Sequence, residues 1–147
     1  TGGAKFASST NTAGDATETI AHTLAVGTNA PSGFSLTVRG QTLTSQQNAS
    51  NTIDAIGGTA ASSTPTFEQF GFRASESGGT AVTVSAPYSF ATSYGYAATA
   101  TSSSLLAVGT GATPVSTLSL RYLTNVAAIT EAGTYAANLV YVATANF

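Results

Sequence analysis

The sequence contains no cysteine, methionine or tryptophan, and only 7% of its 147 residues are charged. Without cysteine the chain has no disulfide, no thiolate metal site and no cysteine nucleophile. Its four basic residues form no cluster, whereas a nucleic-acid interface needs a concentrated cationic surface. No apolar run has the length needed to span a bilayer. We therefore expect neither a nucleic-acid partner nor membrane insertion.

The polar residues of the sequence are mainly hydroxyl side chains rather than charged ones, with 26 Thr and 18 Ser. Disordered chains share this bias, but they lack aromatic and β-branched residues. Here 7 Phe and 6 Tyr accompany repeated alternating runs, which indicates a folded domain. Because the sequence does not begin with methionine, we expect Thr1 to be the end left after removal of a signal peptide. The predicted location is extracellular or at the cell surface.

Apolar and polar residues alternate along several short segments, whereas helical periodicity is almost absent. Residues 20–26 and 34–39 flank a loop rich in turn-forming residues, and we interpret them as a hairpin. Residues 115–122 alternate as well, and residues 134–147 are expected to form one long terminal strand. With weaker strands between them, the sequence predicts an all-β fold, a single β-sandwich or jelly roll of about eight strands.

The first nineteen residues differ from the rest, because Phe6 is their only large apolar residue. One such side chain cannot hold the segment on a core against an ordering cost of about 1–2 kcal/mol per residue. We therefore divide the chain into an N-terminal extension, residues 1–19, and a β-sandwich domain, residues 20–147. The extension is interpreted as a flexible tail or as a strand donated to a neighbouring subunit, with the donated residues expected to be Ala4, Lys5, Phe6, Ala7, Ser8 and Ser9.

Two well-patterned segments also carry a resemblance: AHTLAVGTNAPSGFSLTVRGQTLTS at residues 21–45 and YLTNVAAITEAGTYAANLVYVATANF at residues 122–147. Together with TFEQFGFR at residues 66–73, they resemble uncharacterised secreted surface proteins of candidate phyla radiation bacteria. The resemblance implies export, a β-sandwich and a place at the cell surface, and it brings no catalytic residues. The terminal segment is also similar in style to the last strand of fimbrial and biofilm-filament subunits, which exchange strands between neighbours.

Catalytic and cofactor chemistry finds little support in the sequence. The only histidine, His22, lies on the apolar side of its predicted strand, where a packed side chain is the simpler interpretation than a catalytic base. No G-x-S-x-G elbow is present to expose a serine nucleophile. Neither an EF-hand loop nor a Gly-rich phosphate loop occurs. We expect a protein that is not an enzyme and that uses no metal or cofactor.

Two segments suggest contacts with other molecules. The segment PYSFATSYGY at residues 87–96 contains four rings that could form a core, an intersubunit contact or a sugar-stacking platform, namely Tyr88, Phe90, Tyr94 and Tyr96. Asn48 begins an N-x-S sequon in a polar loop and is a candidate glycosylation site.

These features lead to one main functional hypothesis and one alternative. A charge-poor surface packs against copies of itself with little desolvation of charge, and a long terminal strand offers an edge for pairing. We expect a structural subunit of a pilus-like extracellular filament or surface layer, a homopolymer assembled by donor-strand complementation. The alternative is a monomeric adhesive or carbohydrate-binding module that contacts surface glycans.

Overall fold

The computed structural model describes residues 4–8, 11–15, 17–78, 81–97 and 99–147, with residues 4–8 and 11–15 described by their backbone alone. These residues form fourteen β-strands and no helix, so the predicted all-β fold is confirmed. None of them belongs to a helical segment with the length and hydropathy of a membrane span.

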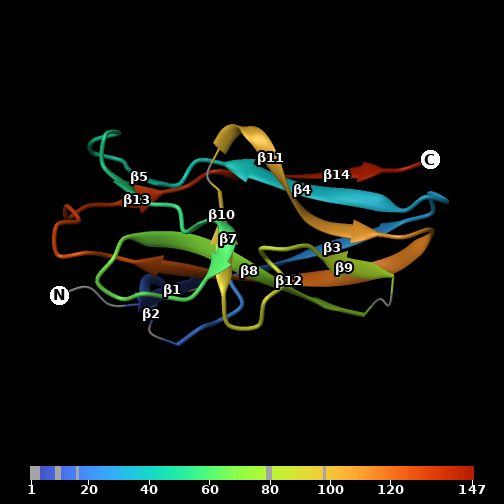
Figure 1. Cartoon of the computed structure of the whole chain (residues 1–147), viewed down its shortest axis with the longest axis horizontal. Coiled ribbons are helices and arrows are strands. Elements are labelled where there is room, and N and C mark those ends of the chain that lie inside the picture. Colours follow the sequence, from blue (N-terminus) through green and yellow to red (C-terminus); the bar gives the residue numbers. More distant parts are fainter. Residues whose placement is uncertain (1–3, 9–10, 16, 79–80, 98) are drawn as a thin grey trace.

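The strands form three sheets, two of which are the layers of a β-sandwich (Figure 1). The larger layer contains β2 (Asn11–Asp15), β1 (Ala4–Ser8), β12 (Thr113–Asn125), β8 (Gln69–Ser77), β10 (Tyr94–Tyr96) and β7 (Gly57–Ala61), with β3 (His22–Thr28) also paired to β12. The opposite layer contains β14 (Leu139–Ala145), β4 (Phe34–Gly40), β11 (Thr99–Gly109) and β9 (Val82–Val84). A small third sheet extends one end with β13 (Tyr135–Ala136), β5 (Leu43–Ser45) and β6 (Thr52–Ile53).

The core lies between the two layers and follows from the alternation of the strands. In β4 every second side chain is buried, and in β12 the same alternation buries Leu118 and Leu120 completely. Aromatic rings stack in this space: the centroids of Phe72, on β8, and Tyr88, from the segment between β9 and β10, lie 4.6 Å apart. Burial of such apolar side chains makes the main favourable contribution to the free energy of folding, so these alternating strands stabilise the sandwich.

Strands β3 and β4 form where alternation predicted them, but the predicted hairpin between them is wrong. Strand β3 pairs with β12, whereas β4 pairs with β11 and β14 in the opposite layer. The loop between them turns at Gly33, whose φ of +83° and contact with the Gly109 carbonyl leave no space for a Cβ. The chain therefore crosses from one layer to the other between β3 and β4. Alternation could not predict this crossing, because it determines which face of a strand is apolar but not which strand lies beside it.

The terminal segment is divided rather than continuous. Strand β13 pairs with β5, and after a break at residues 137–138 strand β14 pairs with β4. The strand count exceeds the predicted eight because several strands, such as β6 and β13, have only two residues. Such short pairings leave too few residues for a recognisable alternation.

The N-terminal extension contributes two strands to the larger layer. Strand β1 lies antiparallel to β12, with Ala4 opposite Asn125 and Lys5 opposite Thr124, and β2 pairs with β1. Strand β1 therefore shares one edge of β12 with β3, which pairs farther along between Thr113 and Leu120. Of the six residues predicted to form a donated strand, residues 4–8 form β1, and Ser9 lies outside the described residues.

Candidate functional site

A pocket of about 430 Å³ opens between the two layers beside the beginning of β14. Tyr122 and Phe70 come from the larger layer, and Tyr141 and Leu139 come from β14. The remaining lining residues are His22, Leu43, Thr124, Tyr135, Ala136 and Ala137. The pocket is therefore an aromatic and aliphatic space at the rim of the sandwich, continuous with the core.

Burial favours the neutral forms of three titratable groups in this pocket, those of His22, Tyr122 and Tyr141. Burial lowers the pKa of His22, which favours the uncharged imidazole. The hydroxyl oxygens of Tyr122 and Tyr141 lie 2.6 Å apart in a hydrogen bond. Burial raises the pKa of Tyr122 to about 12 and moves that of Tyr141 in the same direction. No carboxylate lines the pocket, so His22 has no acidic partner there of the kind that a catalytic triad requires.

Strand β14 is an edge strand without protection. Among the described residues it pairs only with β4, so its other side carries unpaired backbone groups. Natural edges are usually blocked by charge, proline or a bulge, and none of these interrupts LVYVATA. Val140 and Val142 are 46% and 42% exposed on its outer face.

The inner face of β14 is also incompletely covered. Leu139 and Tyr141 point into the pocket between the layers, so alternation places Ala143 and Ala145 on the same inward side. Both alanines are nevertheless exposed, although their partners on β4, Leu36 and Phe34, are buried. The second half of β14 therefore leaves apolar space open at the edge of the sandwich.

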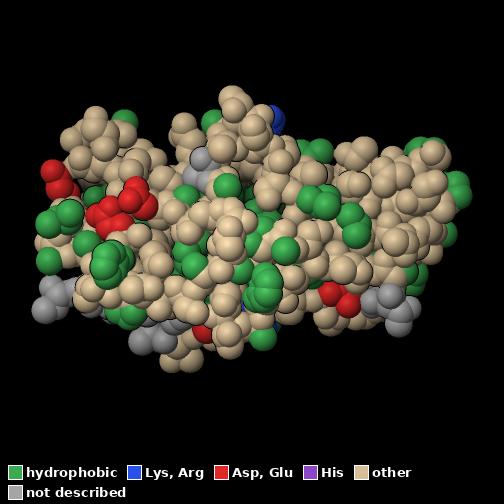
Figure 2. All heavy atoms as spheres, viewed as in Figure 1, with side chains coloured by type: hydrophobic (Ala, Val, Ile, Leu, Met, Phe, Trp, Pro, Cys, Tyr) green, Lys and Arg blue, Asp and Glu red, His purple; other side chains and the backbone are tan. Residues whose placement is uncertain are grey.

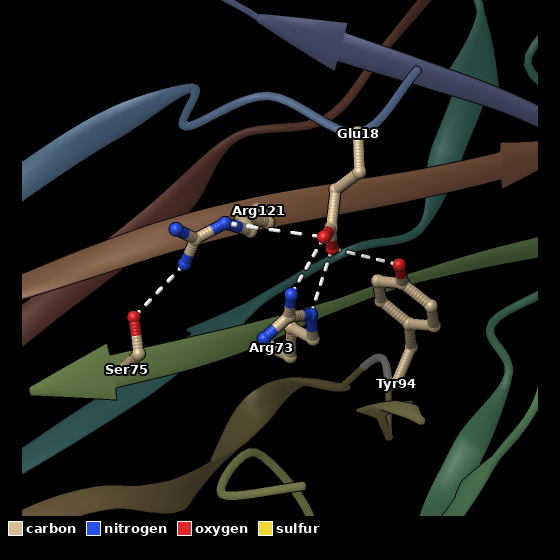
Figure 3. Close-up of polar contacts among 5 residues, drawn as sticks. All are labelled: Glu18, Arg73, Ser75, Tyr94 and Arg121. Carbon is tan, nitrogen blue, oxygen red and sulfur yellow. Dashed lines mark hydrogen bonds and ion pairs between the residues drawn. The ribbon is translucent and has the colours of Figure 1, made fainter. Parts of the chain in front are cut away.

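A cluster of charged and polar groups lies on the outer face of the larger layer (Figure 3). Arg73 on β8 and Arg121 on β12 are directly opposite each other in the strand register. Glu18, from the segment that precedes β3, reaches down to them. Arg73 Nε and Nη2 donate to its two carboxylate oxygens at 2.7 and 2.6 Å, and the Tyr94 hydroxyl donates at 2.7 Å. Arg121 Nε lies 3.9 Å from Glu18 Oε2, and its Nη1 donates to Ser75 Oγ.

The electrostatics of this cluster favour an ionised Glu18. Burial opposes ionisation, but the hydrogen bonds from Arg73 and Tyr94 and the charges of the two arginines outweigh it, so the pKa of Glu18 is lowered. The hydrogen bond to Glu18 raises the pKa of Arg73, and burial together with Glu18 raises that of Tyr94 to about 12. Two like charges opposite each other on neighbouring strands would repel, and the negative charge of Glu18 reduces this repulsion while its hydrogen bonds fix the preceding segment to the sheet.

Acidic residues gather at one end of the molecule. Asp54, Glu68 and Glu131 line a common shallow pocket, and Figure 2 shows acidic side chains grouped at the end that carries β5 and β13. Thr130 donates to Glu68 at 2.6 Å, and Asn51 donates to Glu131. The described residues contain no group of three or more potential ligands with metal-binding geometry.

The four rings of the segment at residues 87–96 divide into two environments. Tyr88, Tyr94 and Tyr96 are buried, at 0%, 5% and 0% exposure, and they pack in the sandwich or on Glu18. A buried ring presents no face to a sugar or to another subunit. Phe90 alone is exposed, at 48%, beside a pocket of about 290 Å³ lined by Gly58, Thr59, Ala60, Ala86, Pro87 and Ser93.

Asn48 lies exposed on a polar turn, where its side-chain oxygen accepts a hydrogen bond from the Ser50 backbone N–H. The amide is accessible to modification in this position.

Sequence reasoning predicted a free edge in the terminal strand but missed the Glu18 cluster. Arg73 and Arg121 lie at outward positions of alternating strands, and this pattern in the sequence indicates only a polar face. The residues next to Glu18 in the sequence do not indicate which side chains it contacts. The absence of charge in residues 139–145 was a usable signal for an unguarded edge.

Comparison of the chain with protein-family models, with curated proteins and with solved structures finds no match. The function is therefore argued from the geometry of these surfaces.

Proposed function

We propose that this chain is a structural subunit of an extracellular filament or surface layer, assembled from copies of itself by the addition of β-strands. The observation that carries the proposal is the position of β1. This strand joins the domain at the edge of β12, in two consecutive residue pairs, and residues 16–21 connect the β1–β2 hairpin to β3. A strand added at an edge through backbone hydrogen bonds can be supplied by a neighbouring copy in the same register.

The Glu18 cluster defines where such an exchange would begin. Three hydrogen bonds from Arg73 and Tyr94 fix Glu18 to the outer face of its own sheet. Residues after Glu18 therefore remain with their own domain, while the hairpin before it is free to pair with another copy. Each subunit then gives one strand and receives one, and this head-to-tail contact propagates into a fibre unless it closes into a ring.

The remaining surface is compatible with close packing of copies. The chain has ten charged residues, and the described part places three of them, Glu18, Arg73 and Arg121, in mutual contact. Contacts between copies then remove few charges from water, which would otherwise be costly. The proposal includes an extracellular location and no catalytic role.

Deletion of residues 1–9 tests the role of β1. We expect the truncated chain to retain a strand-rich far-ultraviolet circular dichroism spectrum but to lose the filaments or layers seen by negative-stain electron microscopy. A synthetic peptide of residues 1–15 should bind the truncated chain when it is added, because the vacated edge of β12 can accept a strand from another molecule. Filaments of normal length from the truncated chain would show that β1 is not the link.

A second candidate function rests on Phe90. Its exposed ring stands beside a pocket with the hydroxyls of Thr59 and Ser93, an arrangement that suits stacking on a sugar ring. A monomeric glycan-binding module would lose glycan retention on Phe90→Ala, whereas Phe67→Ala, at another exposed phenylalanine, would retain it. Equal glycan retention by both variants would remove this alternative.

A further inference from the structure

We infer that the free edge of β14 is an interface with a second copy of this chain, in which two β14 strands pair antiparallel about a two-fold axis at Val142. The partner is a copy rather than a different protein because the strand is complementary to itself, in its backbone, its side-chain sizes and its charge. This contact goes beyond the exchange of β1 and does not require it.

The backbone of β14 is arranged for such pairing. The Asn146 N–H donates to the Gly33 carbonyl at 2.9 Å, and its carbonyl accepts from the Ser32 N–H at 3.1 Å, so the polar groups of Asn146 face the β4 side. Because these groups alternate along a strand, those of Tyr141 and Ala143 face the free edge. In a pairing centred on Val142, Tyr141 of one copy lies opposite Ala143 of the other. The unpaired backbone N–H and C=O groups of these two residues then lie opposite each other and can form hydrogen bonds, and the two Val142 residues form a non-hydrogen-bonded pair.

Side-chain sizes match in this same register. Residues equidistant from Val142 become partners, so on the inner face Tyr141 meets Ala143 and Leu139 meets Ala145. Each large side chain therefore faces a small one, and the exposed inward alanines of one copy receive the tyrosine and leucine of the other. A pairing centred on Tyr141 instead would place the two tyrosine rings opposite each other and leave Ala145 unmatched.

On the outer face, Val142 meets its own copy and Val140 meets Thr144. Val140 and Val142 are about half exposed in the single chain, at 46% and 42%, and the pairing covers the flank of each that faces the free edge. The contact thus buries apolar surface on both faces of the joined sheet, in addition to its backbone hydrogen bonds.

Charge does not oppose the contact, because β14 carries none. The nearest charged residue in the sheet is Arg39, which lies on β4 opposite Val140. In the proposed register the two Arg39 residues occupy different rows, roughly 20 Å apart between Cα atoms, as estimated from strand spacing and rise. That separation exceeds the screening length of about 8 Å at physiological salt, so the two guanidinium groups repel little.

Cysteine cross-linking tests the register directly, because the native chain has no cysteine. In a non-hydrogen-bonded antiparallel pair the two Cα atoms lie about 4.5 Å apart, which suits a disulfide. We expect full-length Val142→Cys to convert under mild oxidation from the 14.5 kDa chain to a linked species of twice that mass. Val140→Cys should remain unlinked, because the Cα atoms of its two copies lie about 14 Å apart, beyond disulfide reach.

The double variant Val140→Cys with Thr144→Cys restores the proposed pairing and should link again, which provides a second test if Val142→Cys folds poorly. Val115→Cys is the matched control, since Val115 is exposed at 68% on β12, away from β14. Linkage of Val142→Cys no greater than that of Val115→Cys, together with no linkage of the double variant, would overturn the inference. Because the readout is a covalent dimer, it is independent of whether filaments form through β1.

Discussion

Strands β12 and β14 are both long and well alternated, but their surroundings differ completely. Strand β12 is paired on both sides, by β8 and by β3 with β1. Several residues on its outward face are also covered: Leu123 and Asn125 are fully buried, and Arg121 is held beside Glu18. Strand β14 is paired on one side, and its inward alanines are exposed. The contrast teaches that three of the charged residues, Glu18, Arg73 and Arg121, help to complete the sheet around β12, whereas the edge of β14 carries no charge and is the surface that we propose for pairing with a second copy.

The largest effect on stability is expected on the outer face of β12. Leu123→Ala should lower the free energy of unfolding by about 2–5 kcal/mol, because it removes a fully buried side chain from a position that lies outside the main core. Chemical denaturation measures this value. Leu105→Ala, at a leucine that is 41% exposed on β11, is the control and should cost much less. Equal losses would mean that the outer face of β12 is not a packed surface.

Removal of the Glu18 partner is expected to have the next largest effect. Arg73→Ala deletes a two-point hydrogen bond to a carboxylate that is 24% exposed, and should lower the free energy of unfolding by about 1.5–3 kcal/mol. The exposed Arg39 provides a matched control, since Arg39→Ala removes an arginine that forms no ion pair with the part of the chain that the structure describes. A cost for Arg73→Ala no larger than that control would show that the cluster does not hold the segment before β3.

A smaller, pH-dependent effect should follow from Glu18 itself. Its pKa in the folded chain is below the ordinary value of 4.5, so the unfolded chain binds the proton more readily. The stabilisation is therefore present above that value and is lost as the pH falls through the lowered pKa. Comparison of the native chain with Glu18→Gln by denaturation between pH 7 and pH 3 should show a difference that shrinks toward acid. A difference that is constant with pH would contradict ionisation as the source of the stability.

Alternation along the sequence was sufficient to predict the fold class and the places of β3, β4 and β12, but it joined β13 and β14 into one strand. It could not predict partners, because a strand such as β3 has the same apolar face whether it pairs with β4 or with β12. It also could not distinguish the buried rings of Tyr88 and Tyr96 from exposed ones, since their segment lies largely outside regular strands. The contacts of Glu18 could not be predicted for another reason: its partners are 55 and 76 residues away in the sequence, and only the folded sheet brings them together.

The pairing of two β14 strands is the proposed contact that the mass of the full-length chain in solution tests most directly. Sedimentation velocity should give twice the 14.5 kDa mass or more for the native chain and for Val115→Lys. Val142→Lys should lose the contact through β14 and sediment at a lower mass than the native chain, because the two-fold axis places its two ammonium groups directly opposite each other. The free energy of unfolding of that variant should change by no more than about 0.5 kcal/mol, as for most surface substitutions. A native chain that remains monomeric, or a Val142→Lys variant that associates as the native chain does, would contradict the account.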